Sequence, residues 1–155
     1  MAEEIQDKEK IKKEAEKVNR IARALKHPNW LERWSAAYAL GELKSPLATE
    51  ALIDALRDRD FDVRRVVVEA LGKLGEYRNI EGMVKRLKEN FPQGDINEEI
   101  YIRKNIIEVL GDYIKESPDE SIKGLLEFLA EESEYPEIKD TAQNVIASMA
   151  KAPKE

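Results

Sequence analysis

The chain has 155 residues, no cysteine, 26 Lys plus Arg, 32 Asp plus Glu and a formal net charge of −6. This length suits a single domain over residues 1–155, and the lack of cysteine excludes disulfides, thiolate nucleophiles and cysteine metal sites. No run approaches the roughly 20 apolar residues of a membrane span, and the N-terminus lacks the apolar core of a signal peptide, so we expect a cytoplasmic chain without membrane contact.

Charge is distributed unevenly along the chain. Residues 1–78 carry 16 Lys plus Arg against 15 Asp plus Glu, a net charge of +1, whereas residues 79–155 carry 10 against 17, a net charge of −7. Nucleic-acid binding needs a basic surface that releases counterions from phosphate, so we do not expect a nucleic-acid partner. A protein or peptide partner, basic toward the C-terminal half, fits better. The excess of Glu and Lys is typical of thermophilic proteins, but also of exposed helices.

The first predicted helix covers residues 10–25 and ends before the sequence HPN at residues 27–29, because Pro and Asn are typical of turns. We expect residues 1–10 to be frayed. The only histidine, His27, lies at this helix end, where it interacts favourably with the helix dipole. Since no partner residue accompanies it, we expect neither a metal ligand nor a general base there.

The next predicted helix carries three aromatic residues at every fourth position, namely Trp30, Trp34 and Tyr38. By helical rotation, Trp34 lies about 120° and Tyr38 about 160° from Leu40, the centre of the apolar stripe, so both should face solvent. Exposed Trp and Tyr side chains are typical binding anchors, which is the role we favour for Trp34 and Tyr38. The alternative, which we favour for Trp30, is that the N-terminal helix covers the aromatic residues as a cap.

The third and fourth predicted helices, residues 47–58 and 61–75, flank a turn that carries Asp58 and Asp60. In the fourth helix, Arg64 falls almost inside the apolar stripe, where a permanent charge is unexpected. Because Arg64 lies in the first turn, its guanidinium can leave the stripe and pair with carboxylates on its own or a neighbouring turn. We interpret the Asp cluster as helix capping together with partners for Arg64.

The remaining predicted helices cover residues 79–90, 103–113, 119–132 and 139–149. The connection between the first two is eight residues longer than in the preceding helix pair, and Phe91 lies near its start. Insertions in repeat arrays map to loops, which often carry recognition, so Phe91 is a candidate contact. The alternative that we favour is a tolerated insertion with Phe91 tucked beneath it.

A basic residue precedes a glycine by eight positions in three of the second helices: Arg33 with Gly41, Arg64 with Gly72, and Arg103 with Gly111. In a weaker fourth copy, Lys139 and Ala147 take these places. The steps of 31, 39 and 36 residues are typical of helical-hairpin repeats, which we place at approximately residues 5–44, 46–76, 79–115 and 118–151. No segment alternates with period two, so the predicted fold is all-α. A recurring glycine costs a helix about 1 kcal/mol relative to Ala, which indicates a close helix approach.

The stretch DRDFDVRRVVVEALGKLGE, residues 58–76, combines an Asp-rich turn, a Val-Arg pair and an Ala-Leu-Gly near the helix end. In these features the chain resembles the HEAT-like repeat, in particular the short version associated with phycobilin lyases. The resemblance implies a right-handed α-α superhelix, or solenoid, of about four HEAT-like helical hairpins. It also implies a structural ladder of basic residues along the stack, Arg33, Arg64, Arg103 and Lys139, with Asp58 and Asp60 as acidic partners.

A solenoid of this kind lines its concave face with the second helices, and such faces bind extended or helical segments of a partner. We therefore predict a non-catalytic scaffold or adaptor that binds a protein or peptide, with self-association as an alternative. The predicted contacts are the residues turned away from the apolar stripes: Trp30, Trp34, Tyr38, Phe61, Arg65, Glu69, Lys73, Tyr101, Lys104 and Glu108.

We find no recognisable catalytic motif in this sequence. It has no Gly-x-Ser-x-Gly elbow and no Gly-rich phosphate loop, and it lacks the paired His-Glu motifs of HEAT-like iron hydroxylases. We therefore expect no enzyme activity, no cofactor and no metal. Family resemblance alone keeps two alternatives, an accessory subunit of a phycobilin-lyase-like or other enzyme complex and, with less support, a DNA-binding HEAT-like enzyme such as an alkylation-repair glycosylase.

Overall fold

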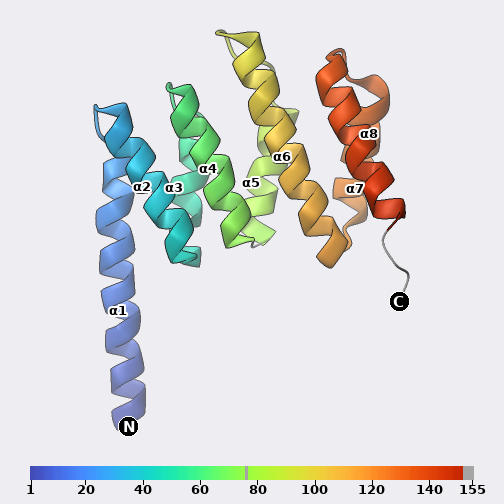
Figure 1. Cartoon of the computed structure of the whole chain (residues 1–155). Coiled ribbons are helices and arrows are strands. Elements are labelled where there is room, and N and C mark those ends of the chain that lie inside the picture. Colours follow the sequence, from blue (N-terminus) through green and yellow to red (C-terminus); the bar gives the residue numbers. More distant parts are fainter. Residues whose placement is uncertain (76, 152–155) are drawn as a thin grey trace. The chain divides into compact units, whose positions relative to one another are not determined.

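The computed structural model describes residues 1–75 and 77–151, and these residues form helices without a strand. Figure 1 shows the α-helices: α1 (Ala2–Arg23), α2 (Trp30–Leu43), α3 (Thr49–Ala55), α4 (Phe61–Leu74), α5 (Tyr77–Lys88), α6 (Ile96–Glu116), α7 (Glu120–Glu132) and α8 (Pro136–Ala150). Short 3-10 helices follow α1 at Ala24–Lys26 and precede α3 at Pro46–Ala48. The prediction of an all-α fold of helical hairpins is confirmed. Residue 76, the end of the predicted second repeat, and residues 152–155 lie outside the described residues.

The chain divides into two compact units, Met1–Asn79 and Ile80–Glu155, called unit 1 and unit 2 below. In unit 1, α1 packs against α2, α3 packs against α4, and α2 and α4 lie side by side. In unit 2, α8 packs against both α6 and α7. Each predicted repeat range therefore contains one pair of helices. The assignment of residues 1–155 to one domain stays a prediction.

Local sequence signals set the helix ends. Among the described residues, four precede an α-helix and accept hydrogen bonds from amides of its first turn, which is how an N-cap satisfies otherwise unpaired donors. These residues are Asn29, Asp60, Asp95 and Asp119. Helix α4 ends at Leu74 and is capped by Gly75, whose φ of +60° lies in the left-handed region that glycine adopts without strain. The turn residues of the sequence thus separate the helices where we expected.

The recurring glycines mark the contacts between second helices. A methyl group on Gly41 of α2 would lie 2.9 Å from Cα and Cβ of Ala70 in α4, which is shorter than normal carbon contacts. A methyl group on Gly111 of α6 would overlap the Val145 side chain of α8. The expected close approach of helices is therefore confirmed at these two positions. It allows the fully buried core residues of each unit to interdigitate.

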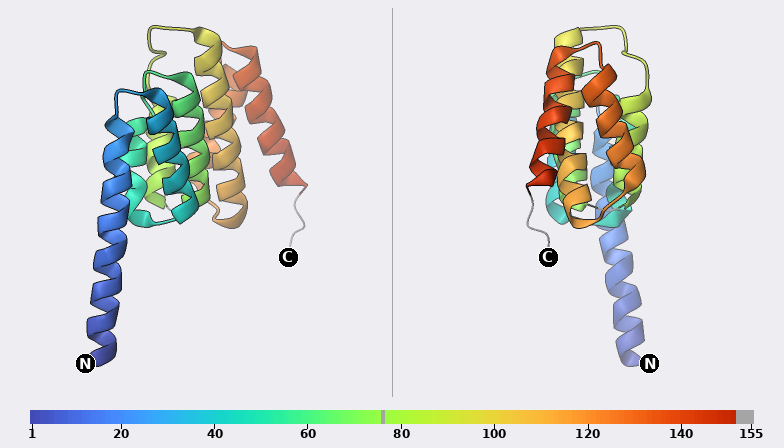
Figure 2. Two further views of the ribbon diagram at one scale, coloured as in Figure 1. Left: turned by 60° about the vertical axis from the view of Figure 1, so that its left-hand side comes forward. Right: turned by 90° about the vertical axis from the view of Figure 1, so that its right-hand side faces the viewer.

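Helix α1 has 22 residues, whereas its hairpin partner α2 has 14. The N-terminal half of α1 projects past the other helices of unit 1 in both views of Figure 2. Val18 is the buried residue of α1, whereas Ile5 and Ile11 are each 62% exposed. Residues 2–10, for which the sequence predicted fraying, belong to this helix. Among the described residues, no helix is both long and apolar enough to cross a membrane.

Candidate functional site

Arg33, in the first turn of α2, joins two neighbouring hairpins of unit 1. Its side chain is 4% exposed, and its Nε and Nη2 donate to the two carboxylate oxygens of Asp58 at 2.8 and 3.1 Å. Nη1 donates to the carbonyl oxygens of His27 and Pro28 at 2.9 and 3.0 Å. The planar guanidinium favours such a bidentate ion pair. The pair holds the turn before α4 against the turn before α2.

Arg64, the corresponding residue of α4, also contacts the turn that carries Asp58. Its Nη1 donates to the backbone carbonyl of Asp58 at 2.8 Å, and its Cζ lies 5.9 Å from the ring centroid of Phe61. The Asp58 carboxylate accepts hydrogen bonds from Arg33 of the preceding hairpin, and carboxylate partners for Arg64 stay a prediction. Asp60 serves as the N-cap and accepts hydrogen bonds from first-turn amides of α4.

In unit 2, Arg103 of α6 belongs to a buried cluster with Glu99 and Arg86. Arg86 donates both Nη atoms to the Glu99 carboxylate at 2.7 Å, and Arg103 donates its Nε to Glu99 at 2.7 Å. The remaining nitrogens of Arg103 donate to the carbonyls of Leu87 and Glu89 at 3.0 and 2.8 Å. Burial raises the pKa of Glu99, but the hydrogen bonds and charges of the two arginines outweigh burial and lower it below its ordinary value.

The fourth repeat has a lysine, Lys139, in place of the repeat arginine. Lys139 is half-buried, and within the described part of the chain its side chain makes no hydrogen bond or ion pair. One turn later on α8, Gln143 Nε2 donates to the carbonyl of Ala130 in α7 at 3.1 Å, so an amide ties this hairpin together. Sequence reasoning missed Gln143, Arg86 and Glu99. A usable signal was the spacing of Glu99 four residues before Arg103, which places a carboxylate beside the repeat arginine.

The aromatic residues of α2 lie beside charged residues on the outer side of unit 1. The rings of Trp34 and Tyr38 stack with centroids 5.5 Å apart and planes 6° apart. The Lys73 ammonium of α4 lies 5.1 Å from the Tyr38 centroid and pairs with Glu42 of α2. This pair raises the pKa of Lys73 and lowers that of Glu42, in both cases chiefly through their hydrogen bond. We call Trp34, Tyr38, Glu42 and Lys73 the α2–α4 surface.

Exposure along α2 differs from both sequence alternatives. Tyr38 is 46% exposed, as expected, but Trp34 is only half-buried rather than open, because Tyr38 covers one face of its ring. Trp30, for which we favoured a cap by the N-terminal helix, is also 46% exposed. The α2 aromatics are therefore accessible at both ends of the row.

The other predicted contacts lie on α4 and α6. On α4, Phe61 is half-buried, Arg65 pairs with Asp62 at 3.2 Å, and Glu69 is exposed. On α6, in unit 2, Tyr101 and Glu108 are exposed and Lys104 is half-buried. The structure brings Lys73 next to α2, whereas the α6 residues form a row of their own.

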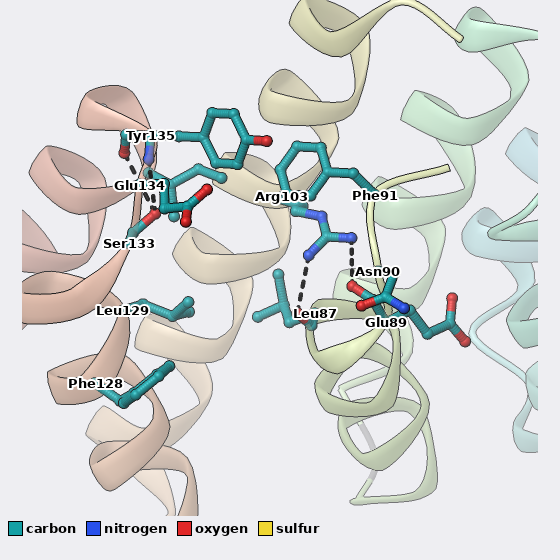
Figure 3. Close-up of a pocket in the computed structure, with 11 residues that line it drawn as sticks. Leu87, Glu89, Asn90, Phe91, Arg103, Phe128, Leu129, Ser133, Glu134 and Tyr135 are labelled. Carbon is teal, nitrogen blue, oxygen red and sulfur yellow. Dashed lines mark hydrogen bonds between the residues drawn. The ribbon is translucent and has the colours of Figure 1, made fainter. Parts of the chain in front are cut away.

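Phe91, at the start of the long connection between α5 and α6, is tucked into unit 2. Its ring lies 4.1 Å from Cζ of Arg103 and 4.3 Å from the ring centroid of Tyr135 (Figure 3). A cavity of about 470 Å³ adjoins these side chains. No cluster of three or more His, Asp or Glu side chains suited to a metal ion occurs in residues 1–75 and 77–151.

A family model described as HEAT repeats matches residues 18–94, the range that contains α2, α3, α4 and α5. This chain carries HEAT repeats. The repeat family proposed from the Asp-rich turn and the Ala-Leu-Gly motif is thereby confirmed.

The HEAT-repeat chain is similar to curated proteins over part of its length. It is 42% identical over 62 residues to the bilin biosynthesis protein PecE of Mastigocladus laminosus, a match that covers 39% of this chain and 23% of that protein. It is 30% identical over 93 residues to the deoxyhypusine hydroxylase of Aspergillus clavatus, covering 59% of this chain and 28% of the relative. The chain thus spans about a quarter of the length of these relatives.

These relatives correct the prediction that the chain is not an enzyme. Deoxyhypusine hydroxylases from several Aspergillus species match it, and their name is that of an enzyme, so the HEAT-repeat chain has relatives with catalytic function. The missing sequence motifs misled us because a repeat array can serve an enzyme without carrying a recognisable catalytic motif in every part.

A solved structure of an engineered protein also matches the HEAT-repeat chain, with a TM-score of 0.56 and 22% identity. The match covers 88% of this chain and 64% of the engineered protein. At this identity, the likeness supports the helical-hairpin fold.

Proposed function

We propose that this HEAT-repeat chain is a scaffold that binds a protein segment through the α2–α4 surface. The observation that carries the proposal is the exposed Tyr38 ring, stacked on the half-buried Trp34 beside the Lys73–Glu42 pair. Aromatic side chains supply large contact areas at low entropic cost, and the adjacent charges orient a partner's polar groups. Tyr101, Lys104 and Glu108 stay predicted contacts, and the cytoplasmic location stays a prediction.

Selection of peptides on the intact chain tests this proposal. A library of random peptides displayed on phage supplies binders, whose synthetic copies are titrated into the Trp30→Phe variant so that Trp34 is the sole tryptophan. We expect saturable changes in Trp34 fluorescence, and binding at least about tenfold weaker after Tyr38→Ala, since a lost anchor costs about 1.4 kcal/mol or more.

The matched control for this experiment is Leu47→Ala, because Leu47 is a 52% exposed apolar residue of the same unit outside the α2–α4 surface. It should leave affinity unchanged. Peptides that bind Tyr38→Ala and Trp34→Ala as tightly as the unmodified chain would contradict the proposal.

The names of the relatives favour a second role, in which this binding serves an enzyme. One matched protein is named for bilin biosynthesis and others for hydroxylation of deoxyhypusine. We test the first by incubating the chain with a bilin and an acceptor protein and recording the absorption spectrum. The second is tested by mass spectrometry of a deoxyhypusine-containing protein, where a gain of one oxygen atom is the positive result. Unchanged spectra and masses would contradict an independent activity of these two kinds.

A further inference from the structure

The cavity of unit 2 lies between the α5–α6 connection and the α7–α8 turn, whereas the α2–α4 surface belongs to unit 1. Figure 3 shows Phe91 and Arg103 on one side of the cavity and Tyr135, Ser133 and Phe128 on the other. Apolar and aromatic groups make up most of it, namely Leu87, Phe91, Phe128, Leu129, Tyr135 and Ile138. Leu87 and Ile138 are buried, whereas Phe128 is 60% exposed, so the cavity has an apolar floor and an open apolar edge.

The repeat register explains why a cavity occurs at this place. In unit 1, Asp58 lies six residues before Arg64, and its carboxylate pairs with Arg33 of the preceding hairpin. The residue six before Lys139 is Ser133, whose short side chain hydrogen-bonds with the backbone of Tyr135. No carboxylate from that turn therefore reaches Arg103, and the space is lined by rings instead.

Arg103 does not make this cavity an anion site. Its three nitrogens already donate to Glu99 and to two backbone carbonyls, and the Phe91 ring covers its guanidinium at 4.1 Å. Glu134 lines the cavity, and its exposed carboxylate would repel an anion entering from solvent. The interior thus suits an uncharged side chain, and the edge suits positive charge.

We propose that this cavity binds a basic segment of a partner protein, which inserts one aromatic side chain beside Phe128 and Tyr135 and pairs a Lys or Arg residue with Glu134. Charge complementarity favours this occupant, because residues 79–155 carry 17 Asp plus Glu against 10 Lys plus Arg. Phe128 supplies an exposed aromatic anchor next to a preformed hollow, as in peptide-binding pockets that take a single large side chain.

The experiment titrates three fluorescein-labelled peptides into the full chain and follows fluorescence anisotropy. The probe is Gly-Lys-Lys-Phe-Lys-Lys-Gly, and its comparisons replace the Phe by Ala or all four Lys by Glu. We expect saturable submillimolar binding of the probe and binding at least about tenfold weaker for both comparisons. The variants Phe128→Ala and Glu134→Lys should each weaken the probe to a similar extent.

Matched controls separate the cavity from other causes. Leu47→Ala removes an exposed apolar side chain of unit 1, and Glu116→Lys reverses an exposed charge of unit 2 that does not line the cavity. Both should bind the probe like the unmodified chain. Because Phe128 and Glu134 are exposed, their variants should fold, which circular dichroism checks.

Three results would overturn the proposal. The first is a lack of saturable probe binding, and the second is undiminished binding of the probe to Phe128→Ala. The third is that the Ala peptide binds as tightly as the probe, because charge attraction alone would then explain the binding. Loss of probe binding in Tyr38→Ala instead of Phe128→Ala would assign the peptide to the α2–α4 surface. The two proposals therefore fail separately.

Discussion

Arg33 and Arg103 occupy the same position in their repeats, yet they take their carboxylates from different directions. Both donate to backbone carbonyls at the end of their own hairpin's first helix or in the turn that follows. Arg33 then pairs with Asp58, which comes 25 residues later, whereas Arg103 pairs with Glu99, four residues earlier. The recurring position was visible in the sequence, but its partners were not, because carboxylates stand at several compatible distances.

Replacing Asp58 by Asn should destabilise the chain by about 3 kcal/mol, because it leaves the buried Arg33 without a compensating charge. Urea unfolding followed by circular dichroism measures the change. The control is Asp62→Asn, since the Asp62 side chain is 49% exposed and its pair with Arg65 should contribute less than about 1 kcal/mol. Equal effects of the two substitutions would show that the Arg33 pair is not a structural link.

Glu99 should contribute to the pH dependence of stability in acid. Its folded pKa lies below the unfolded value, so its contribution is present above about pH 4.3 and is lost as pH falls through the folded pKa. We expect the free energy of unfolding of Glu99→Gln to fall less steeply in this range than that of the unmodified chain. Urea titrations at several acidic pH values measure both slopes, and parallel slopes would contradict the assignment.

At the scale of elements, the second helices approach each other most closely where a glycine faces the neighbouring helix. Gly41 of α2 meets the backbone and side chain of Ala70 in α4, so the two helix axes cannot separate without opening the core between them. The eight-residue spacing from Arg33 to Gly41 places the ion pair and the close contact two turns apart on α2. Helix α2 is thereby fixed near both of its ends.

Substituting Gly41 by Ala should lower the free energy of unfolding by about 1–2 kcal/mol, because the steric overlap with Ala70 outweighs the gain in helix propensity. The control is Gly124→Ala in α7, where no heavy atom lies within 4 Å of the added methyl group. There, propensity alone should raise stability by up to about 1 kcal/mol. Thermal and urea unfolding compare the two variants, and stabilisation by Gly41→Ala would contradict the close contact.

The N-terminal half of α1 should exchange its amide hydrogens much faster than the rest of the helix. Ile5 and Ile11 are exposed, and Lys8–Glu4 and Lys13–Glu9 are surface pairs of small worth. A helical segment without tertiary contacts is marginal in water. Hydrogen exchange measured by NMR should show residues 6–13 opening readily and residues 18–23 protected. Equal protection would indicate that another surface covers this segment.

At the scale of the whole molecule, the two halves of the chain differ in net charge. Residues 1–78 are nearly neutral, and the excess of acidic residues lies in residues 79–155. The aromatic α2–α4 surface belongs to unit 1 and the cavity with Glu134 to unit 2. A partner that uses the cavity therefore meets a more acidic environment than one that uses the α2 aromatics.

A further prediction is that the intact chain does not bind duplex DNA, even at low salt. Its net charge of −6 opposes association with phosphates, and there is no basic half to compensate. Electrophoretic mobility of a labelled duplex with increasing protein measures this. Retardation that weakens steeply with added salt would contradict the prediction and revive the DNA-binding alternative.

Much of the fold followed from local sequence features. The helix pairs, their order and the glycine contacts were predictable, because helical period, N-caps and turn residues act within a few residues of one another. The site was predicted less well. Trp34 is shielded by Tyr38, which rotation about one helix axis could not show, because side-chain stacking depends on rotamers. The expectation of no enzyme activity was wrong, since it rested on short motifs alone.

The sequence by itself determined that this chain is a series of helical hairpins with a basic residue and a glycine at fixed positions. Only the tertiary structure decided that Asp58 closes on Arg33, that Arg86 joins Glu99 and Arg103, and that Phe91 stacks on Tyr135 beside an open cavity. The physical reason is distance along the chain. Helix formation depends on neighbours one turn away, whereas buried ion pairs and cavities depend on which residues packing brings together across tens of positions.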